Sequence, residues 1–491
     1  MPLRGLPGII RALGKGDRRR GATSVRLGQR TRSALRGVGR QIWKRIGVTV
    51  FPTITLAEYE TKRVRVPAAT DSDLELAEAL SAVGDLSSRL DVRWLAGGQV
   101  EVTASSWAGV VRFSQFEIRV IPKLVGGTLN VLRMLEYAAG IRLLARLPHD
   151  GRLPSEGTDL FELIVMLLVE EAKALLRDGL IRDYRPTDET LTVMRGRLRM
   201  RDQFLRRYGS LDRLECSFDE YDGDIPENQL LAAALSAAGP RVRGWDLKAD
   251  VRMLDAVISG ACEPTTHDPN WFRRRISYGR RNSRYRSAHE LALLVLEGLA
   301  LRDLFDTSSI RTDSFMLNMN VVFERFISRL VDESLVGSGL RLSTQESFRT
   351  VVVDEDSGFT YSSVRPDLVI VETASRRAVP VDVKYKLYGQ KKVSTGDVYQ
   401  LFLYAYALGG DSKTPMAGVI YPSNRAASGP RLVVKSMAGS PGAYIRGLGL
   451  DVPSALLSLN SPAEQQLHAD VLMHVREITG MHGACSVGDV G

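Results

Sequence analysis

The sequence predicts a multidomain α+β protein with a β-rich N-terminal module, a helical middle region and a C-terminal α/β core. The core has the order helix, strand, strand, strand, helix, strand (αβββαβ). Two observations predict this class. The chain has 491 residues, of which 44% are hydrophobic and 25% charged, which is typical of a globular protein with about three domains. Along the chain, the hydrophobic pattern changes from alternation to helical spacing and then to a mixture of both.

Five segments follow from these changes in pattern. The β-rich module contains "VTVFPTITLAEYETKRVRVP" and "VEVTASSWAGVVRFSQFEIRVIPKL", where apolar residues tend to occupy every second position. The middle region contains "DLFELIVMLLVEEAKALLRDGL" and "AHELALLVLEGLALRDLF", where they recur at intervals of three and four. The predicted segments are a basic, disordered arm (1–47), the β-rich module (48–126), the helical middle domain (127–312), the α/β core (313–460) and a C-terminal helix and tail (461–491).

The basic charge of the chain is concentrated in the arm. Residues 1–50 hold thirteen Lys and Arg against one acid, Asp17, which gives a net charge of +12. The remaining residues hold 53 basic and 56 acidic side chains, a net charge of −3. The arm could bind phosphates by releasing counterions. Its Gly/Arg-rich sequence, which lacks core residues, favours the alternative of a disordered extension.

Cysteine content and hydropathy indicate the compartment. Only three cysteines occur (Cys216, Cys262 and Cys485), and none forms a CxxC pair. Neither a disulfide framework nor a thiolate zinc site is therefore expected, and a reducing cytoplasm fits best. No apolar run approaches the roughly 18 to 20 residues that a membrane span needs, so we expect no membrane association.

Two basic segments of the middle domain have competing interpretations. "RRRISYGRRNSRYR" (273–286) mixes arginines with tyrosines, a composition suited to phosphates and stacked bases. It is equally compatible with a solvated turn in which Tyr285 packs into the core. "MRGRLRM" (194–200) could contact DNA, but we expect Arg195 and Arg197 to pair with the acids of "DEYDGD" (219–224). The histidines lie in unrelated contexts, and His468 and His474 are expected on the surface of a C-terminal helix.

The strongest chemical signal lies in "VRPDLVIVETASRRAVPVDVKYKLYGQ" (364–390), two apolar strands that carry charged residues. Alternation places Asp382 and Lys384 on one face of the second strand. A tight connection at "TASRRA" brings Asp367 of the first strand beside Asp382. Two facing carboxylates repel each other unless a divalent cation lies between them, and oxygen ligands of this kind suit Mg²⁺ or Mn²⁺. Lys384 can then support the charge of a phosphate or orient a water.

The spacing of these residues matches a nuclease signature. Pro366-Asp367, fourteen intervening residues and Asp382-Val383-Lys384 form the pattern of PD-(D/E)xK nucleases. Glu324 on the preceding helix is a candidate accessory acid and metal ligand. Gln400 and Tyr404 lie one turn apart on the following helix and face the same way. The simpler interpretation is a surface salt bridge of Asp367 or Asp382 with Lys384 or Lys386.

The chain resembles the McrC family, the nuclease subunit of McrBC-type 5-methylcytosine-dependent restriction systems. The resemblance covers roughly Thr53 to Pro422. It rests on ordered blocks that include "ITLAEYE", "FEIRVIPK", "CSFDEYDGDIPENQLLAAAL", "NVVFERFI", "RPDLVIV", "VDVKYK" and "DVYQLFLYAYAL".

The resemblance implies an Mg²⁺-dependent DNA endonuclease in which Asp367, Asp382 and Lys384 form the catalytic triad and Glu324 and Gln400 are auxiliaries. It implies Asp367, Asp382 and Glu324 as metal ligands, modified DNA as substrate and an McrB-like AAA+ GTPase as partner. The partner would be stimulated by the β-rich module (48–126). Two alternatives stay open: a non-catalytic adaptor that activates the GTPase ring, and a stand-alone RecB-like nuclease, which the Gln400/Tyr404 pair favours.

Overall fold

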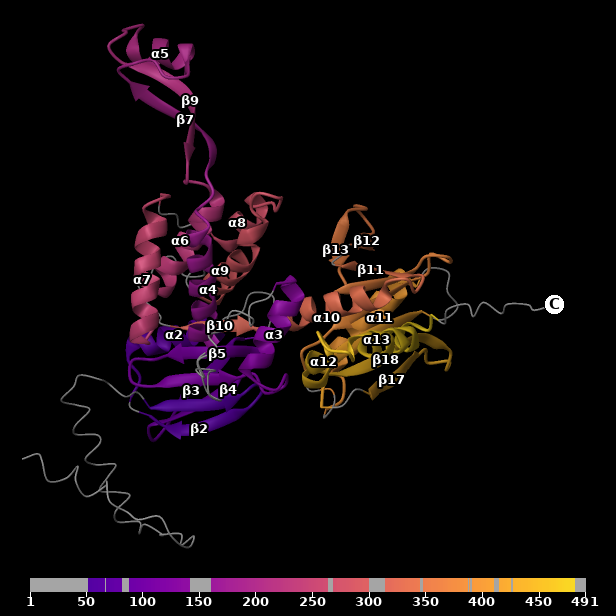
Figure 1. Ribbon diagram of the computed structural model, residues 1–491. Coiled ribbons are helices and arrows are strands. Elements are labelled where there is room, and N and C mark those ends of the chain that lie inside the picture. Colours follow the sequence, from indigo (N-terminus) through magenta and orange to yellow (C-terminus); the bar gives the residue numbers. More distant parts are fainter. Residues whose placement is uncertain are drawn as a thin grey trace, which may run out of the picture. The chain divides into compact units, whose positions relative to one another are not determined.

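The computed structural model describes the chain from Pro52 to Met481 with gaps (Figure 1). The described residues are 52–66, 68–81, 88–141, 160–263, 268–299, 314–344, 348–386, 388, 391–409, 415–424 and 427–481. The predicted arm (1–47) and the last ten residues of the predicted tail lie outside them. Within the described residues, no helix combines the length and the apolar character needed to cross a membrane.

The N-terminal module consists of two sheets and a helix. In β4, the buried residues Val100, Val102 and Ala104 alternate with half-buried ones, as a period of two requires. They share a core with Leu76 and Leu80 of the helix. The sheets have the orders β2-β4-β3 and β1-β6-β5-β10. The elements before β10 are β1 (Thr53–Ala57), β2 (Thr61–Arg65), α2 (Asp71–Ser81), β3 (Leu90–Leu95), β4 (Gln99–Ala104), β5 (Trp107–Arg112) and β6 (Glu117–Ile121).

The strand that completes the second sheet comes from much later in the chain. β10 (Phe315–Asn318) pairs antiparallel with β5, and Phe315 pairs with Val110. Gly109 permits this pairing because it adopts φ +145° and because a Cβ there would lie 2.2 Å from the Phe315 carbonyl oxygen. Helix α10 (Met319–Leu335) follows β10 directly, with the Asn318 side chain accepting a hydrogen bond from Asn320 N. The sheet of the N-terminal module therefore fixes the start of α10.

The middle region is helical where its sequence has helical spacing. α4 buries one broad face that includes Leu160, Ile164 and Leu168. Tyr285 is fully buried, donates a hydrogen bond to Asn228 Oδ1 at 3.0 Å and accepts one from Ile181 N at 2.9 Å. The helices are α3 (Thr128–Ala139), α4 (Leu160–Arg177), α6 (Pro226–Ala238), α7 (Trp245–Ser259), α8 (Pro269–Arg275), the 3₁₀ turn η3 (Ser283–Tyr285) and α9 (Arg286–Leu299).

A β-ribbon interrupts these helices, which the helical prediction for the middle region did not include. β7 (Asp183–Leu191) and β9 (Leu214–Asp222) pair over nine positions, with α5 (Met200–Arg207) and the short β8 (Arg197–Leu198) between them (Figure 1). β7 has no buried residue and carries few apolar side chains. Its sequence therefore lacks the apolar alternation by which half-buried strands are predicted.

In the C-terminal region, β11, β14 and β15 lie between α10 and α11, and β16 follows, which is the expected order of helix, three strands, helix and strand. An additional hairpin, β12 and β13, lies between β11 and β14. A six-stranded sheet has the order β11-β14-β15-β16-β18-β17. β15 and β16 are parallel, as are β16 and β18, and the other pairs are antiparallel. The elements after α10 are β11 (Leu340–Thr344), β12 (Phe348–Val353), β13 (Thr360–Val364), β14 (Leu368–Glu372), β15 (Ala378–Val383), α11 (Thr395–Leu408), β16 (Met416–Ser423), β17 (Ala427–Lys435), β18 (Pro441–Asp451), α12 (Val452–Ser458) and α13 (Glu464–Thr479).

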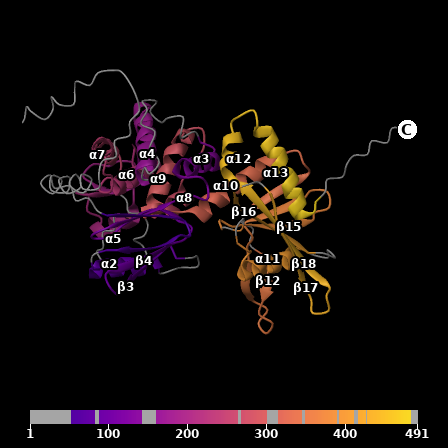
Figure 2. The same cartoon turned by 90° about the horizontal axis from the view of Figure 1, so that it is seen from below.

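Helices cover both faces of this sheet (Figure 2). Ala417, Val419 and Tyr421 of β16 share a core with residues of α11, whereas Met416 and Ile420 belong to the core that includes α13. The sheet is buried on both sides here, which explains the continuous apolar run of β16.

The sequence pattern merged two structural units before β14. The first of the three strands expected after the helix corresponds to two separate strands: β11, which pairs with β14, and β12, which pairs with β13 in a separate hairpin. The described residues from Thr53 onward belong to one compact unit. The predicted boundaries at 126/127 and 312/313 within it stay predictions.

Candidate active site at the ends of β14 and β15

Asp367 and Asp382 lie opposite each other at the ends of neighbouring strands. Leu368 of β14 pairs with Val381 of β15, so the next position along the antiparallel register brings Asp367 to Asp382. Asp367 Oδ2 accepts a hydrogen bond from Val383 N at 2.7 Å. Asp382 is only 1% exposed, whereas Asp367 is partly exposed. The tight connection between the strands thus produces the predicted pair of carboxylates.

Lys384 extends the same face of β15. Its backbone N donates to Ile420 O at 2.9 Å, which continues the pairing with β16 for one residue. Its Nζ lies 2.8 Å from Asp382 Oδ2. Burial opposes the charge of this ammonium, but the attraction of Asp382 and then Asp367 outweighs it, so the pKa of Lys384 is raised. The lysine is therefore held as a cation beside the carboxylates.

The electrostatics of the pair disfavour two negative charges. Burial raises the pKa of Asp367, and the charges of Asp382 and Glu324 raise it further, against the opposing hydrogen bond from Val383 N. Asp382 Oδ2 is buried and, apart from the ion pair with Lys384, has no hydrogen-bond donor among the described residues. The charge of Lys384 alone therefore does not balance the charges of Asp367 and Asp382.

Gln400 and Tyr404 of α11 act on the segment that leads into Asp367. Gln400 Nε2 donates to the Tyr404 hydroxyl at 2.7 Å, and that hydroxyl donates to Arg365 O at 3.0 Å. Burial is the main cause of the raised pKa of Tyr404, and the charge of Asp382 contributes. The two side chains therefore anchor the backbone two residues before Asp367, and they face the same way as predicted.

Glu324 lies on α10, half-buried, and its charge acts on Asp367. α10 also packs on β11 and β15. Among the residues that the structure describes, no group of three or more His, Cys, Asp or Glu side chains is arranged to hold a metal ion. The expected role of Glu324 as a third protein ligand stays a prediction.

The lysine two positions further on has a different partner. Lys386 Nζ lies 2.7 Å from Asp397 Oδ2, and Ser394 caps α11 by accepting from Asp397 N. Several hydrogen bonds lower the pKa of Asp397 in spite of its burial. Lys386 thus belongs to the start of α11, and the ion pair of Asp382 with Lys384 is largely buried and not a surface salt bridge.

Residues 102–422, more than half of the chain, match the family described as McrBC 5-methylcytosine restriction system component. The chain belongs to this family. The resemblance to McrC that the sequence blocks carry is thereby confirmed at the level of the family. No curated protein matches the sequence.

Two solved structures are similar to this member of the McrBC family. The first is the refined half-complex from a tetradecameric assembly of Thermococcus gammatolerans McrB AAA+ hexamers with bound McrC. It matches with a TM-score of 0.53 and 19% identity over 87% of this chain and 100% of the matched chain. The second, the cryo-EM structure of the Thermococcus gammatolerans McrBC complex, has a TM-score of 0.40 and 22% identity and covers 58% of this chain and 88% of the matched one. At these identities the first match shows a shared fold.

Hydrogen bonds connect three of the sequence blocks that carry the McrC resemblance at Tyr385, next to Lys384 of the candidate site. Glu58 and Tyr59 of "AEYE" contact Tyr385 of "VDVKYK", and Glu58 also accepts from Leu124 N, next to "FEIRVIPK", at 3.0 Å. Sequence reasoning did not identify these residues as functional. Their presence in the ordered blocks was the signal that could have found them.

The basic segment of residues 273–286 is largely engaged in structural contacts in this McrBC-family chain. Arg273 pairs with Glu297, Arg281 with Asp183, and Arg284 with Asp178, while Arg275 lies over Trp271 and Arg286 over Tyr278. Together with the buried Tyr285, these contacts favour the interpretation as a structural turn.

Of the two arginines expected to pair with the acids of residues 219–224, Arg195 does so and Arg197 does not in the described part of the chain. Arg195 pairs with Glu220 at 3.3 Å and lies over the Phe218 ring, whereas Arg197 makes no ion pair within the described residues. His468 lies on α13 and contacts Ser334 at 2.9 Å, and His474 contacts Asp470 O of its own helix at 2.7 Å. Neither histidine belongs to a metal-binding group among the described residues.

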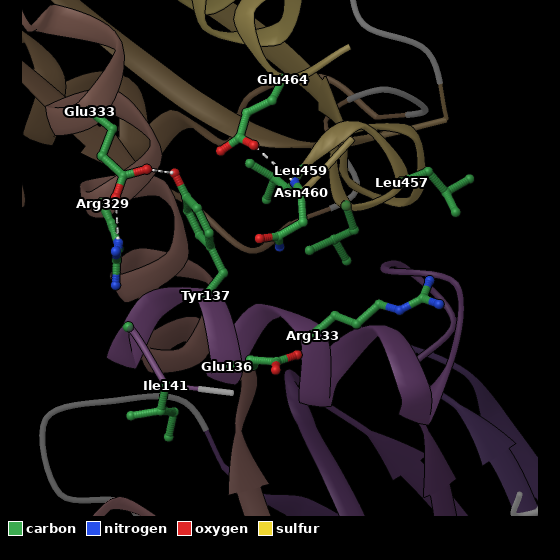
Figure 3. Close-up of a pocket in the computed structure, with 12 residues that line it drawn as sticks. Arg133, Glu136, Tyr137, Ile141, Arg329, Glu333, Leu457, Leu459, Asn460 and Glu464 are labelled. Atoms are coloured by element: carbon green, nitrogen blue, oxygen red, sulfur yellow. Dashed lines mark hydrogen bonds and ion pairs between the residues drawn. The ribbon is translucent and has the colours of Figure 1, made fainter. Parts of the chain in front are cut away.

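A cavity of about 430 Å³ lies between α3, α10 and the connection from α12 to α13 (Figure 3). It contains none of the predicted site residues. Arg329 pairs with Glu333 at 2.7 Å, Tyr137 donates to Glu333 at 2.5 Å, and Asn460 N donates to Glu464 at 3.1 Å. Several of the polar groups that line it are thus paired with one another. Because none of the predicted site residues lines the cavity, it is separate from the candidate active site.

Proposed function

We propose that this chain is the metal-dependent DNA endonuclease subunit of a modification-dependent restriction system. The observation that carries the proposal is the convergence of Asp367, Asp382 and Lys384 at the ends of β14 and β15. This arrangement agrees with a PD-(D/E)xK nuclease core. The same proposal assigns Glu324 and Gln400 to auxiliary roles.

A divalent cation fits the carboxylate pair. Burial, and then the negative charges of Asp382 and Glu324, raise the pKa of Asp367, and a cation between the aspartates would favour their ionised form. Asp382 Oδ2, buried and without a directed hydrogen bond, is a suitable ligand atom. Mg²⁺ is commonly held by one or two carboxylates, with waters and phosphate oxygens completing its shell. Asp367 and Asp382, with or without Glu324, would therefore hold Mg²⁺ or Mn²⁺.

The side chains around this position have distinct tasks in phosphodiester hydrolysis. A bound divalent ion polarises a phosphate oxygen and lowers the pKa of water. Lys384, held as a cation by Asp382, stabilises the negative charge that develops on the phosphate. Gln400 and Tyr404 keep the segment at Arg365 in place, which orients Asp367.

We further propose an AAA+ GTPase of the McrB type as partner and modified DNA as substrate. Membership of the McrBC family supports this, as does the fold shared with a structure that contains McrB AAA+ hexamers and bound McrC. The β-rich module (48–126) is the proposed contact with the partner. The GTPase would then recognise the DNA and supply the energy for translocation, and this chain would hydrolyse the phosphodiester bond.

Cleavage of plasmid DNA tests the proposal. Methylated and unmethylated plasmid would be incubated with Mg²⁺, with and without the McrB-type GTPase and GTP. We expect the wild type and Lys435→Ala, on the edge strand β17 of the same sheet, to cut the methylated plasmid when partner and GTP are present. Lys384→Ala should be inactive. Mn²⁺ should raise the Tm of the wild type but not of Asp382→Asn, because a ligand stabilises only the state that binds it.

The outcomes separate the competing functions. Cutting without the partner would favour a stand-alone RecB-like nuclease. If no variant cuts and the chain stimulates the GTPase with or without Lys384, the nuclease proposal is wrong and the adaptor is the better account.

A further inference from the structure

Tyr385, which directly follows Lys384, is held from two sides by the N-terminal module. Its hydroxyl donates to Glu58 Oε1 at 2.6 Å, and its backbone carbonyl accepts from the Tyr59 hydroxyl. Tyr385 is fully buried, and Glu58 is 6% exposed. Two residues from the turn between β1 and β2 thus fix both the side chain and the backbone of one residue 326 or 327 positions away.

These contacts lie directly after the point where the backbone pairing of β15 with β16 ends. The pairing with β16 ends at Lys384 N, and the next backbone bonds are local, from Lys386 N to Lys384 O and from Tyr388 N to Lys386 O, both at 2.9 Å. Among the residues that the structure describes, the carbonyl of Tyr385 accepts no backbone hydrogen bond, and its partner is the Tyr59 hydroxyl. Loss of such a bond leaves a buried acceptor unsatisfied, at a cost of about 1–3 kcal/mol, or reorients the peptide.

The turn that supplies the two residues adopts an uncommon backbone conformation. Tyr59 has φ +59°, the left-handed region that few residues other than glycine occupy. Such strain persists only where the surrounding structure imposes it. Glu58 supports the turn from the other side because its second carboxylate oxygen accepts from Leu124 N at 3.0 Å, next to the end of β6.

The same module also holds the helix that packs on Tyr385. The Phe323 ring of α10 lies 5.6 Å from the Tyr385 ring. The start of α10 is bound to Ser106, whose carbonyl accepts from Met319 N at 3.0 Å and whose hydroxyl accepts from Asn320 Nδ2 at 2.7 Å. The N-terminal module therefore contacts Tyr385 directly and through α10.

We propose that Glu58 and Tyr59 are positioning residues for the nuclease site, and that they hold Lys384 in its reactive position by fixing Tyr385. This role rests on the proposed function. A displacement of about 1 Å at a reacting group can cost about 100-fold in rate, so a small change at this turn is sufficient to alter cleavage. It gives the predicted partner-binding module a direct physical connection to the catalytic strand.

Removal of single hydroxyl groups in the full-length chain tests the proposal. Tyr59→Phe deletes the bond to the Tyr385 carbonyl, and Tyr385→Phe deletes the bond to Glu58 while keeping the ring on Phe323. Tyr137→Phe is the matched control, since Tyr137 also donates its hydroxyl to a glutamate, Glu333, away from the candidate site (Figure 3). Single-turnover cleavage, DNA affinity, Tm and hydrogen exchange of residues 383–388 would be measured for each variant, with partner and GTP present in the cleavage assay.

We expect Tyr59→Phe and Tyr385→Phe to reduce the cleavage rate about tenfold or more at unchanged DNA affinity. Both should also increase hydrogen exchange at residues 383–388. Tyr137→Phe should leave cleavage and this exchange at wild-type levels even if it lowers Tm to the same extent.

Two results would overturn the positioning role. If both variants cleave at the wild-type rate while Lys384→Ala is inactive, Glu58 and Tyr59 are structural contacts only and the proposed function stands. If the wild type itself does not cleave under any of these conditions, the proposed function fails and the positioning role fails with it.

Discussion

Glu58 is a carboxyl group whose surroundings oppose its ionisation. Burial raises the pKa of Glu58 to about 7, although hydrogen bonds from Tyr385 and from the backbone at Leu124 act in the opposite direction. An ordinary glutamate loses its proton near pH 4.3 to 4.5. Between these two values the folded protein binds more protons than the unfolded chain, so this residue lowers stability as the pH rises from about 4.5 to 7.

We therefore predict that Glu58→Gln becomes more stable relative to the wild type as the pH increases. The difference in the free energy of unfolding should grow by up to about 3 kcal/mol between pH 4.5 and pH 8, since each pKa unit corresponds to about 1.4 kcal/mol. Urea unfolding of both proteins at several pH values measures it, and ionisable groups common to both cancel. A difference that stays constant with pH would contradict the raised pKa.

At the candidate site, sequence reasoning succeeded where the relevant contacts are local. Asp367, Asp382 and Lys384 lie on two strands joined by a short turn, so alternation and spacing were enough to predict that they meet. Glu58 and Tyr59 contact Tyr385 across more than 300 residues. No period or spacing encodes such a contact, because it depends on how separate elements pack.

At the scale of elements, Phe315 is the point where β10 meets two glycines. A Cβ at Gly109 would lie 2.2 Å from the Phe315 carbonyl oxygen, and one at Gly298 would lie 2.1 Å from its ring. Gly109 also requires φ +145°. The close pairing of β5 with β10, and with it the start of α10, depends on the absence of side chains here.

Gly109→Ala should accordingly destabilise the protein by about 2 kcal/mol or more, because the backbone of β10 must move or β5 must take a strained conformation. Gly396→Ala is the matched control. It lies in the first turn of α11, is exposed, has open space around its Cβ position and should raise stability slightly through helix propensity. Denaturant unfolding of the two variants compares them directly. Equal effects would mean that the β5–β10 contact is not tightly packed.

The predictability of each element followed from how much of it is buried. α10 and α11 were predicted from the helical spacing of their apolar residues, which the structure buries on each helix. The ribbon of β7 and β9 was missed because β7 buries no residue and so lacks the apolar alternation of a half-buried strand. β12 was merged with β11 because only three residues separate them in the sequence, which does not reveal that they pair with different strands.

At the scale of the whole molecule, charge is distributed very unequally. Residues 1–50 carry a net charge of +12 and the rest −3. This asymmetry could be determined from the sequence alone, because counting needs no contacts. The pairing of β10, which follows the middle domain in the sequence, with β5 of the N-terminal module could not be determined in this way. A four-residue segment does not specify its pairing partner.

Removal of residues 1–50 should therefore weaken non-specific DNA binding and its dependence on salt. Each phosphate neutralised by Lys or Arg adds about 0.9 to the slope of log K against log salt concentration. We expect a steep slope for the full chain and a shallow one for the truncated chain, measured by fluorescence anisotropy with a duplex of random sequence. Identical slopes would show that the arm does not contact DNA.

The pairing of β10 with β5 also sets an order of events during synthesis. β5 ends at Arg112, and residues 113–314 must leave the ribosome before Phe315 can reach it. At about 5–20 residues per second, this takes on the order of 10 s or more. During that interval the edge of β5 is open to other strands. Synonymous codons that slow translation between these strands should thus favour aggregation, whereas a chaperone that shields strand edges should act on the nascent chain before residue 318 emerges.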